Sequence, residues 1–397
     1  MRAVTEDLIN EFGINLAYHF SEVLNTPLAK PYWVFISLSH KCNLDCRMCG
    51  VKHVLKGQEL EFDLVKKALN EVAGWDSDCV VLFTGGEPFL RRDIFDIIGY
   101  SVSLGLKTEV VSNGSLINNP EIAKNIIESG LKNIAISLDG AHVDTHDYIR
   151  ASAGAHKKAT DALRYLSQAK RIKGPGPQIS AWVTIMNQNV LELYQIISLA
   201  DSLGVECLVY HPVIAVQDDM QNTVSQSRLW IDESNAGIFK EQIDKIMDYQ
   251  KKNGLVAFLH NPYLWLDYFQ GKISRKDWKC NPFVFIDIGP DGEVRSCGAP
   301  FGNIKDMSLE ACLNTQEAHN ARERMLRCRK PCLQTCWGRP EADSLTGIVN
   351  GFIGEINKLE AEKGQKNKLL SEAFEILSGY ERMTIRKHNK THEKQAQ

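Results

Sequence analysis

The 397-residue chain lacks the features that would place it in a membrane or on a nucleic acid. No apolar run approaches the roughly 18 residues that cross a bilayer, so no transmembrane segment is expected. The start, MRAVTEDLINEFG, lacks the basic stretch, apolar core and cleavage site of a secretory signal, which predicts a cytoplasmic protein. The net charge is only -3, so no nucleic-acid partner is expected.

The sequence also lacks the evenly spread cysteine pairs that are typical of small secreted scaffolds. Its eleven cysteines are an odd number, and most of them fall in two groups. In a reducing compartment such grouping indicates metal binding or redox chemistry. Three others lie in apolar or helical stretches, and we interpret them as buried core thiols: Cys79, Cys207 and Cys312.

Short β-rich runs alternate with amphipathic helices from residue 31 to about residue 215. This alternation predicts parallel strands with right-handed crossovers, in an open sheet or an incomplete barrel. The predicted strands are Trp33 to Ser37, Cys79 to Phe83, Thr108 to Val111, Asn133 to Ser137, Ser180 to Ile185 and Cys207 to Tyr210.

Unusual motifs follow the first four of these strands. Ligands of parallel α/β folds gather at the carboxyl ends of the strands, so these four loops are expected to converge on one rim. The motifs are SHKCNLDCRMCG (39–50), Gly85-Gly86-Glu87-Pro88, Ser112-Asn113-Gly114 and Ser137-Leu138-Asp139-Gly140.

The first motif holds Cys42, Cys46 and Cys49 at CX3CX2C spacing, three thiols where a closed metal site normally has four ligands. Zinc is one interpretation, with His40 or His53 as the fourth ligand. The other is an iron–sulfur cube held by three cysteines, whose open iron binds a chelating molecule through an amine and a carboxylate.

CX3CX2C after the first strand and GGEP after the second resemble the radical S-adenosylmethionine (SAM) enzymes, over residues 31 to 215. The resemblance implies a partial (β/α)6 TIM-type barrel in which Cys42, Cys46 and Cys49 bind three irons of a [4Fe-4S] cluster and the fourth iron binds SAM. An external low-potential donor would reduce the cluster. SAM would then be cleaved to methionine and a 5′-deoxyadenosyl radical that abstracts hydrogen from an organic substrate.

The same resemblance gives candidate SAM-binding residues. Gly85 and Gly86 would allow close backbone approach to the methionine part, and Glu87 would pair with its ammonium group. The short polar residues at the strand ends, with Asp139, suit the ribose or the carboxylate. Arg150 would bind the SAM carboxylate, and a surface helix charge is the alternative. The full set is Gly85, Gly86, Glu87, Ser112, Asn113, Ser137, Asp139 and Arg150.

A second cysteine group lies near the other end of the chain. Its CX(9–15)GX4C start resembles the SPASM and twitch extensions of radical SAM enzymes, which implies one auxiliary [4Fe-4S] cluster; a zinc ribbon is the alternative. We expect Cys280 and Cys297 to be ligands, together with two of the last three cysteines. The group consists of Cys280, Cys297, Cys328, Cys332 and Cys336, and residues 283–288 and 293–296 are predicted to form a β-hairpin.

These motifs divide the chain into four parts. Residues 1–30 are predicted to hold an amphipathic helix. Its polar side is acidic, which disfavours a helix on an anionic membrane surface, so we expect it to pack on the barrel or on a partner. Residues 31–276 form the radical SAM barrel and its helical extension, and residues 277–340 the small cysteine-rich hairpin and helix module. Residues 341–397 hold C-terminal helices, and their polar tail from residue 386 is predicted to be disordered.

The substrate is not encoded in these motifs. About 30 residues precede the barrel, fewer than the peptide-binding domain of many related enzymes, so a small metabolite, sugar or lipid-like molecule is favoured over a ribosomal peptide. The auxiliary cluster would assist a net oxidation or a carbon-centred bond formation. His142, His146 and His211 are acid–base candidates by position only. A non-catalytic zinc-binding scaffold is the second alternative.

Overall fold

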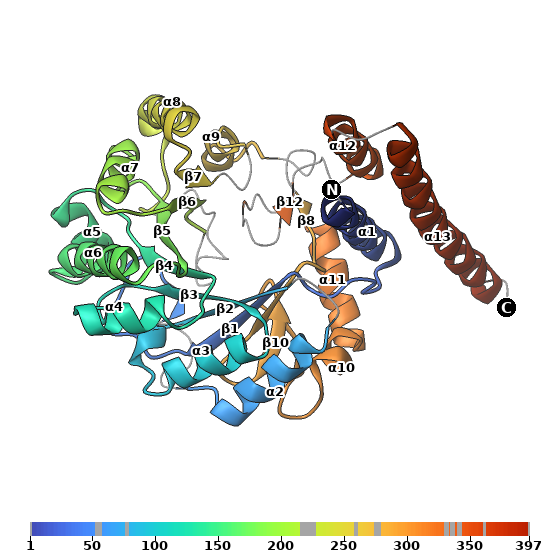
Figure 1. The fold of residues 1–397 in the computed structure, drawn as a ribbon, viewed down its shortest axis with the longest axis horizontal. Coiled ribbons are helices and arrows are strands. Elements are labelled where there is room, and N and C mark those ends of the chain that lie inside the picture. The colour runs from blue at the N-terminus through green and yellow to red at the C-terminus, as the bar shows by residue number, and fades with distance from the viewer. Residues whose placement is uncertain are drawn as a thin grey trace.

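The computed structural model describes residues 2–51, 58–75, 79–214, 228–257, 261–273, 279–328, 333, 338–339, 344–359 and 363–395. Within these ranges the chain forms one large sheet with helices outside it, and a group of helices to one side (Figure 1). None of the helices in these ranges combines the length and the apolar character that spanning a membrane requires.

The centre of the sheet is a run of parallel strands in sequence order, as the βα alternation predicted. The sheet does not close, so the fold is a partial TIM-type barrel of the α/β class. All six predicted strands are confirmed, with small differences at their ends. They are β1 (Trp33–Ser39), β2 (Val80–Gly85), β3 (Lys107–Ser112), β4 (Asn133–Ser137), β5 (Gln178–Ile185) and β6 (Cys207–Pro212).

Helices cover the outer face of this sheet (Figure 1). The first of them, α2 (Phe62–Ala73), buries Val65, Leu69 and Val72, whose spacing gives one apolar helix face. The same core holds every second residue of β1, from Val34 to Leu38. The others are α3 (Ile94–Ser103), α4 (Pro120–Ile127), α5 (Val143–Arg150), α6 (Ala155–Lys173), α7 (Leu193–Ser202), α8 (Ala236–Asn253) and α9 (Leu264–Phe269), with the short strand β7 (Val256–Ala257) beside β6.

The predicted C-terminal hairpin is confirmed, and it extends the barrel sheet. Strand β9 (Phe285–Ile288) pairs with β10 (Glu293–Ser296) in antiparallel fashion and with β1 in parallel, Phe285 opposite Trp33. The hairpin is therefore part of the barrel wall, where the sequence suggested a separate unit. The rest of this region is β8 (Lys279–Cys280), β11 (Ala299–Asn303), α10 (Leu309–Leu313), α11 (Gln316–Arg327) and β12 (Gly338–Arg339).

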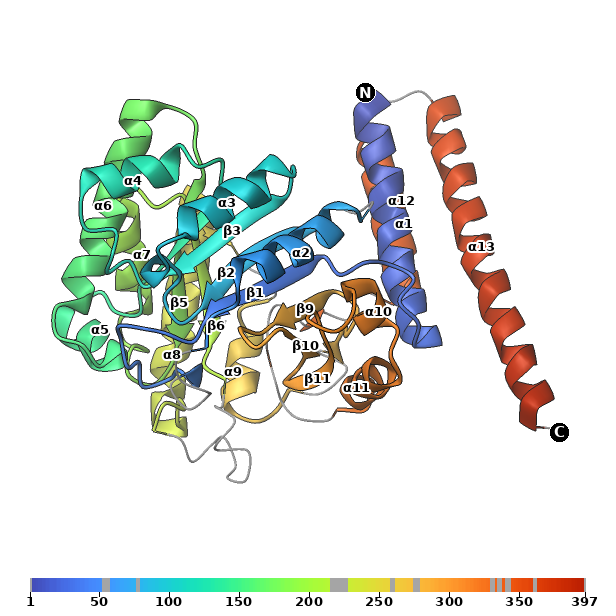
Figure 2. The same cartoon turned by 90° about the horizontal axis from the view of Figure 1, so that it is seen from below.

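The N-terminal helix α1 (Arg2–Leu24) packs against the two C-terminal helices, α12 (Leu345–Lys358) and α13 (Lys363–Gln395), beside the barrel (Figures 1 and 2). Phe12 stacks on Phe352 with ring centroids 4.4 Å apart, and Phe20 stacks on Tyr380 at 5.2 Å. The sequence predicted that this helix packs on the barrel or on a partner. In the structure it packs mainly on the two C-terminal helices of its own chain, while Tyr18 packs with Phe283 and Phe285.

The prediction of a disordered tail from residue 386 is wrong for residues 386–395, which continue α13. A polar composition alone suggested disorder, because such a segment cannot form its own core. A helix that has already formed, however, extends by one hydrogen bond per added residue without a new nucleation step.

Candidate functional site

The CX3CX2C loop leaves the carboxyl end of β1, with Cys42 exposed, Cys46 buried and Cys49 between the two. Burial raises the pKa of the Cys42 and Cys46 thiols, and the nearby Cys49 thiol raises both further. The three sulfurs therefore lie close enough to influence one another. His40, one of the two histidines considered as a fourth zinc ligand, lies within the described residues, and His53 lies outside them.

The two glycines of GGEP are required by the cysteine loop itself. A Cβ on Gly86 would overlap the carbonyl oxygen of Lys41, and one on Gly85 would overlap that of Ser39. The amide of Gly86 donates to Ser39 O at 2.6 Å, and that of Glu87 donates to Lys41 O at 2.9 Å. These glycines allow close backbone approach to the base of the cysteine loop, and their approach to the methionine part of SAM stays a prediction.

Glu87 joins the end of β2 to the end of β3. It is 1% exposed, and its Oε1 accepts hydrogen bonds from Phe89 N at 3.1 Å and Ser112 Oγ at 2.8 Å. Its Oε2 accepts from Asn113 N at 2.8 Å. Burial raises the pKa of Glu87 even though these donors favour its charged form. Pairing of Glu87 with a SAM ammonium group stays a prediction.

The polar residues at the ends of β3 and β4 face the same rim. Asn113 Nδ2 lies 4.0 Å from Cys42 Sγ and donates to Asn43 Oδ1 at 3.0 Å, so β3 reaches into the cysteine loop. Asn43 Nδ2 in turn donates to Ser115 Oγ at 2.8 Å. Ser137 ends β4 and is half-buried. Two of the predicted SAM-binding residues, Asn113 and Ser112, are thus brought to one place with the cysteines and Glu87.

Arg150, the last residue of α5, lies against the buried cysteine. Its Nη1 is 3.8 Å from Cys46 Sγ, and its Nη2 forms an ion pair of 2.5 Å with Asp139 Oδ2. Asp139 is fully buried and its Oδ1 accepts from Thr184 N at 2.7 Å. With Arg150 only 8% exposed, the alternative of a surface helix charge is wrong. The structure brings the two predicted residues together as a pair.

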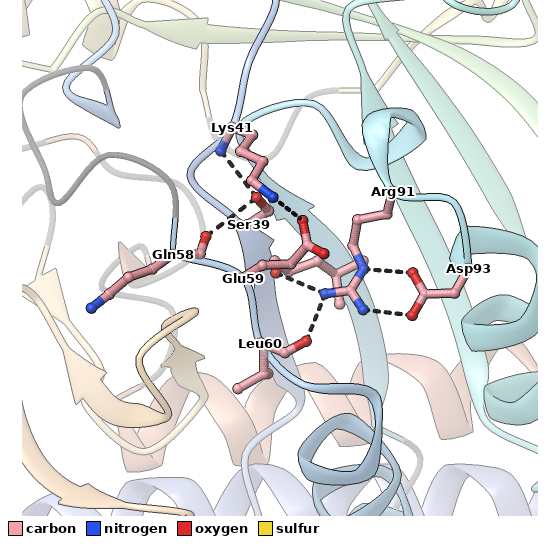
Figure 3. A network of polar contacts seen from close by, with 8 residues as sticks. Ser39, Lys41, Gln58, Glu59, Leu60, Arg91 and Asp93 are labelled. Carbon is pink, nitrogen blue, oxygen red and sulfur yellow. Dashed lines mark hydrogen bonds and ion pairs between the residues drawn. The ribbon is translucent and has the colours of Figure 1, made fainter.

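Arg47 in the cysteine loop and Arg91 outside it, neither of which the sequence analysis singled out, donate to backbone carbonyls near the site. Arg47 Nε donates to Tyr148 O at 2.8 Å and its guanidinium lies over the Tyr148 ring at 4.1 Å. Arg91 Nη1 donates to Leu60 O at 2.6 Å, and Arg91 pairs with Asp93 at 2.7 Å (Figure 3). No sequence signal separates these side chains from ordinary surface arginines.

The three histidines considered for acid–base roles are placed differently. His146 is 1% exposed and accepts from Asp139 N at 3.1 Å, which fits a structural role. His142 pairs with Gln195 at 2.9 Å. His211, at the end of β6, packs edge-on against Trp182 with centroids 5.0 Å apart, and burial lowers its pKa to about 4. It is therefore neutral near pH 7.

Two members of the second cysteine group, Cys280 and Cys297, lie toward the amino end of β1, away from the first group. Cys280 packs against the apolar cluster that includes Phe283 and Phe285, and Cys297 occupies the β10–β11 turn with a left-handed φ of 47°. The seven residues of β1 span about 20 Å at roughly 3.3 Å per residue, which sets the scale of the separation. Cys328 follows α11 and is half-buried, and Cys332 and Cys336 lie outside the described residues.

Family profiles match both cysteine regions. Residues 36–179 match the Radical SAM superfamily, and residues 280–337 match the SPASM iron–sulfur cluster-binding domain. The chain therefore belongs to the radical SAM superfamily and carries a C-terminal SPASM domain. The cofactors of these two domains are a [4Fe-4S] cluster, SAM and auxiliary iron–sulfur.

Curated relatives have more than one activity. An AdoMet-dependent heme synthase of Methanosarcina barkeri is 30% identical over 184 residues, 46% of this chain and 50% of the relative. A PqqA peptide cyclase of Methylocella silvestris is 23% identical over 82% of this chain and 88% of its own length. The chain spans about half the length of the first curated relatives that it matches.

A solved structure shows the same fold. Streptococcus suis SuiB bound to its precursor peptide SuiA superposes with a TM-score of 0.58, over 76% of this chain and 68% of SuiB. The sequence identity is 12%, so this likeness concerns the fold alone.

Proposed function

We propose that Cys42, Cys46 and Cys49 hold the SAM-cleaving [4Fe-4S] cluster. This proposal rests on what lies together at the end of β1. Three neighbouring thiols lie there, next to a turn that only glycine fits, and a buried arginine contacts Cys46. Thiolates are the ligands of such clusters, and the loop leaves one iron without a cysteine. When bound, the reduced cluster would supply the electron that cleaves SAM.

The residues around the loop would orient SAM. Asn113 lies beside Cys42 and Ser112 beside Glu87, and both would meet polar groups of the ligand. Ser137 ends the next strand of the rim. The guanidinium of Arg150 provides a positive charge for a carboxylate there. Gly85 and Gly86 act indirectly, by letting the turn support the cysteine loop.

Cys280, Cys297 and Cys328 are proposed as ligands of the auxiliary cluster, with Cys332 or Cys336. Their support is the thiol chemistry of the set and its position at the far end of β1, where a cluster would exchange electrons with the barrel interior without blocking SAM. An external low-potential donor would supply the first cluster.

A peptide is the proposed substrate, in place of the small metabolite that the sequence analysis favoured. The relative aligned over 82% of this chain is a peptide cyclase, and SuiB binds a precursor peptide. The similarity to a peptide cyclase over most of the chain is stronger support than the short segment before the barrel, which suggested a small molecule. An iron tetrapyrrole is the second candidate, because the 30% identical relative is a heme synthase.

The cluster assignment is tested with anaerobically reconstituted protein, SAM and a strong reductant. Formation of 5′-deoxyadenosine is measured by mass spectrometry. Cys42→Ala should abolish it while the circular dichroism spectrum stays unchanged, and Cys79→Ala, a buried core thiol, should retain it. Unchanged 5′-deoxyadenosine with Cys42→Ala would refute the assignment.

The substrate class is tested in the same reaction. Peptides encoded near the gene are added in one series and Fe-coproporphyrin III in another, and mass changes are recorded. A SAM-dependent mass loss on a peptide supports the proposal. Turnover of the tetrapyrrole alone would replace it with the second candidate.

A further inference from the structure

The Asp139–Arg150–Cys46 contact carries a role beyond SAM binding. Asp139 is fully buried, and Arg150 is 8% exposed and forms its ion pair with Asp139. The charge of Arg150 also acts on the buried Glu87 carboxylate. Arg150 Nη1 lies 3.8 Å from Cys46 Sγ. Burying this ion pair is costly unless its geometry is well fixed, so its position directly behind one cysteine calls for an explanation.

Asp139 is well fixed by its surroundings. Its Oδ1 accepts from Thr184 N at 2.7 Å, so the other oxygen, Oδ2, is directed to the guanidinium of Arg150. Its own amide donates to His146 Nδ1 at 3.1 Å, and its carbonyl accepts from Asn189 Nδ2 at 2.9 Å. The Asp139 carboxylate is therefore held in one orientation, with Oδ2 paired to the Arg150 guanidinium.

We propose that Asp139 is a positioning residue that holds the Arg150 guanidinium against Cys46 Sγ, and that this N–H···S contact raises the reduction potential of the first cluster. Hydrogen bonds and positive charge near a cluster sulfur stabilise the reduced state, which carries one more negative charge. The inference rests on the proposed function, because it takes Cys46 as a cluster ligand. It adds that SAM binding is not the only task of Arg150.

The test variant is Asp139→Asn. The asparagine Oδ1 can still accept from Thr184 N, and its NH2 group then faces the NH2 group of Arg150, so the contact with Arg150 is broken with little change in shape. The second variant is Arg150→Gln. Asp147→Asn is the matched control, because Asp147 lies on α5 with Arg150 but its carboxylate accepts from Gly154 N and His156 N and does not pair with Arg150.

In the reconstituted protein, the first cluster is identified as the one whose EPR signal changes when SAM is added. The readout is the midpoint reduction potential of that cluster, measured without SAM. Arg150→Gln and Asp139→Asn should both lower this potential, and the double variant should be no lower than Arg150→Gln alone. Asp147→Asn should leave it unchanged. Iron content and circular dichroism identify variants that fail to fold, and Arg150→Lys, which keeps the charge, then serves as the second test: it should shift less than Arg150→Gln.

The sign of the shift separates the explanations. If Asp139 acted only as a nearby negative charge, its removal would raise the potential, and that result would overturn the inference. An unchanged potential in Arg150→Gln with weakened SAM binding would also overturn it, since Arg150 would then serve SAM alone. Absence of any SAM-responsive cluster signal in the wild type would instead contradict the proposed function.

Discussion

Among single residues, Gly86 has the strictest steric requirement near the cysteine loop. Because a methyl group there would overlap Lys41 O, Gly86→Ala must displace the loop. We expect it to lose most of the iron of the first cluster and to lower the free energy of unfolding by about 1 to 3 kcal/mol. Iron per chain and thermal unfolding measure the two effects.

Gly99 in α3 is the control for this substitution. Nothing lies within 4 Å of a Cβ at Gly99, so Gly99→Ala should keep the iron and raise stability by up to about 1 kcal/mol. Equal iron loss in both variants would contradict the steric explanation.

Asp287 gives a residue-level prediction about pH. Burial raises its pKa to about 6 from 3.8, even though Ser37 Oγ donates to it at 3.2 Å and Arg295 lies 3.7 Å away. An acid whose pKa is higher in the folded state contributes most stability when protonated, and this contribution is lost as pH rises toward and through about 6. Asp287→Asn removes this loss.

The stability gain of Asp287→Asn should therefore grow between about pH 5 and pH 7.5, by about 1 kcal/mol. Urea unfolding at the two pH values measures it, with Asp291→Asn in the adjacent turn as a comparison. A gain that is the same at both pH values would show that Asp287 is not protonated in the folded state.

Among the elements, the packing of α1 on α12 and α13 is separate from the barrel core. Phe12 is 4% exposed and stacks on Phe352, so Phe12→Ala should cost this unit about 3 to 5 kcal/mol. Hydrogen exchange should rise in α12 and α13 and stay unchanged in β1 to β6. Phe374→Ala removes the same side chain at a site 68% exposed, and it should change little; equal effects would refute the packing role.

How far the sequence predicted these elements depends on the range of their interactions. β4 was predicted with its observed bounds because a local apolar run between turns defines it. The pairing of β9 with β1 joins residues about 250 positions apart, and no local pattern reports it. The same holds at the site: the motifs placed Asn113 and Cys42 on one rim, but the pairing of Asp139 with Arg150 depends on how α5 packs.

At the scale of the whole molecule, Cys280 and Cys297 lie at the end of β1 opposite to the CX3CX2C loop. Cys297 is exposed in its turn and distant from the SAM site, so Cys297→Ala should lose about four iron atoms per chain and leave SAM cleavage without substrate intact. Iron analysis and 5′-deoxyadenosine assays measure both. Cys207→Ser should keep all the iron, and loss of SAM cleavage in Cys297→Ala would show that the two sites are not independent.

The parallel pairing of β9 with β1 also bears on how such a protein can be divided or recombined. A protein fragment that ends before β9 would expose Trp33–Ile36 as an open sheet edge with apolar side chains. Such an edge can pair with other chains, so we expect the fragment to aggregate. A SPASM region exchanged from another enzyme would have to supply a strand with matching register. The barrel and the SPASM region share one sheet, so the two regions have to be engineered together.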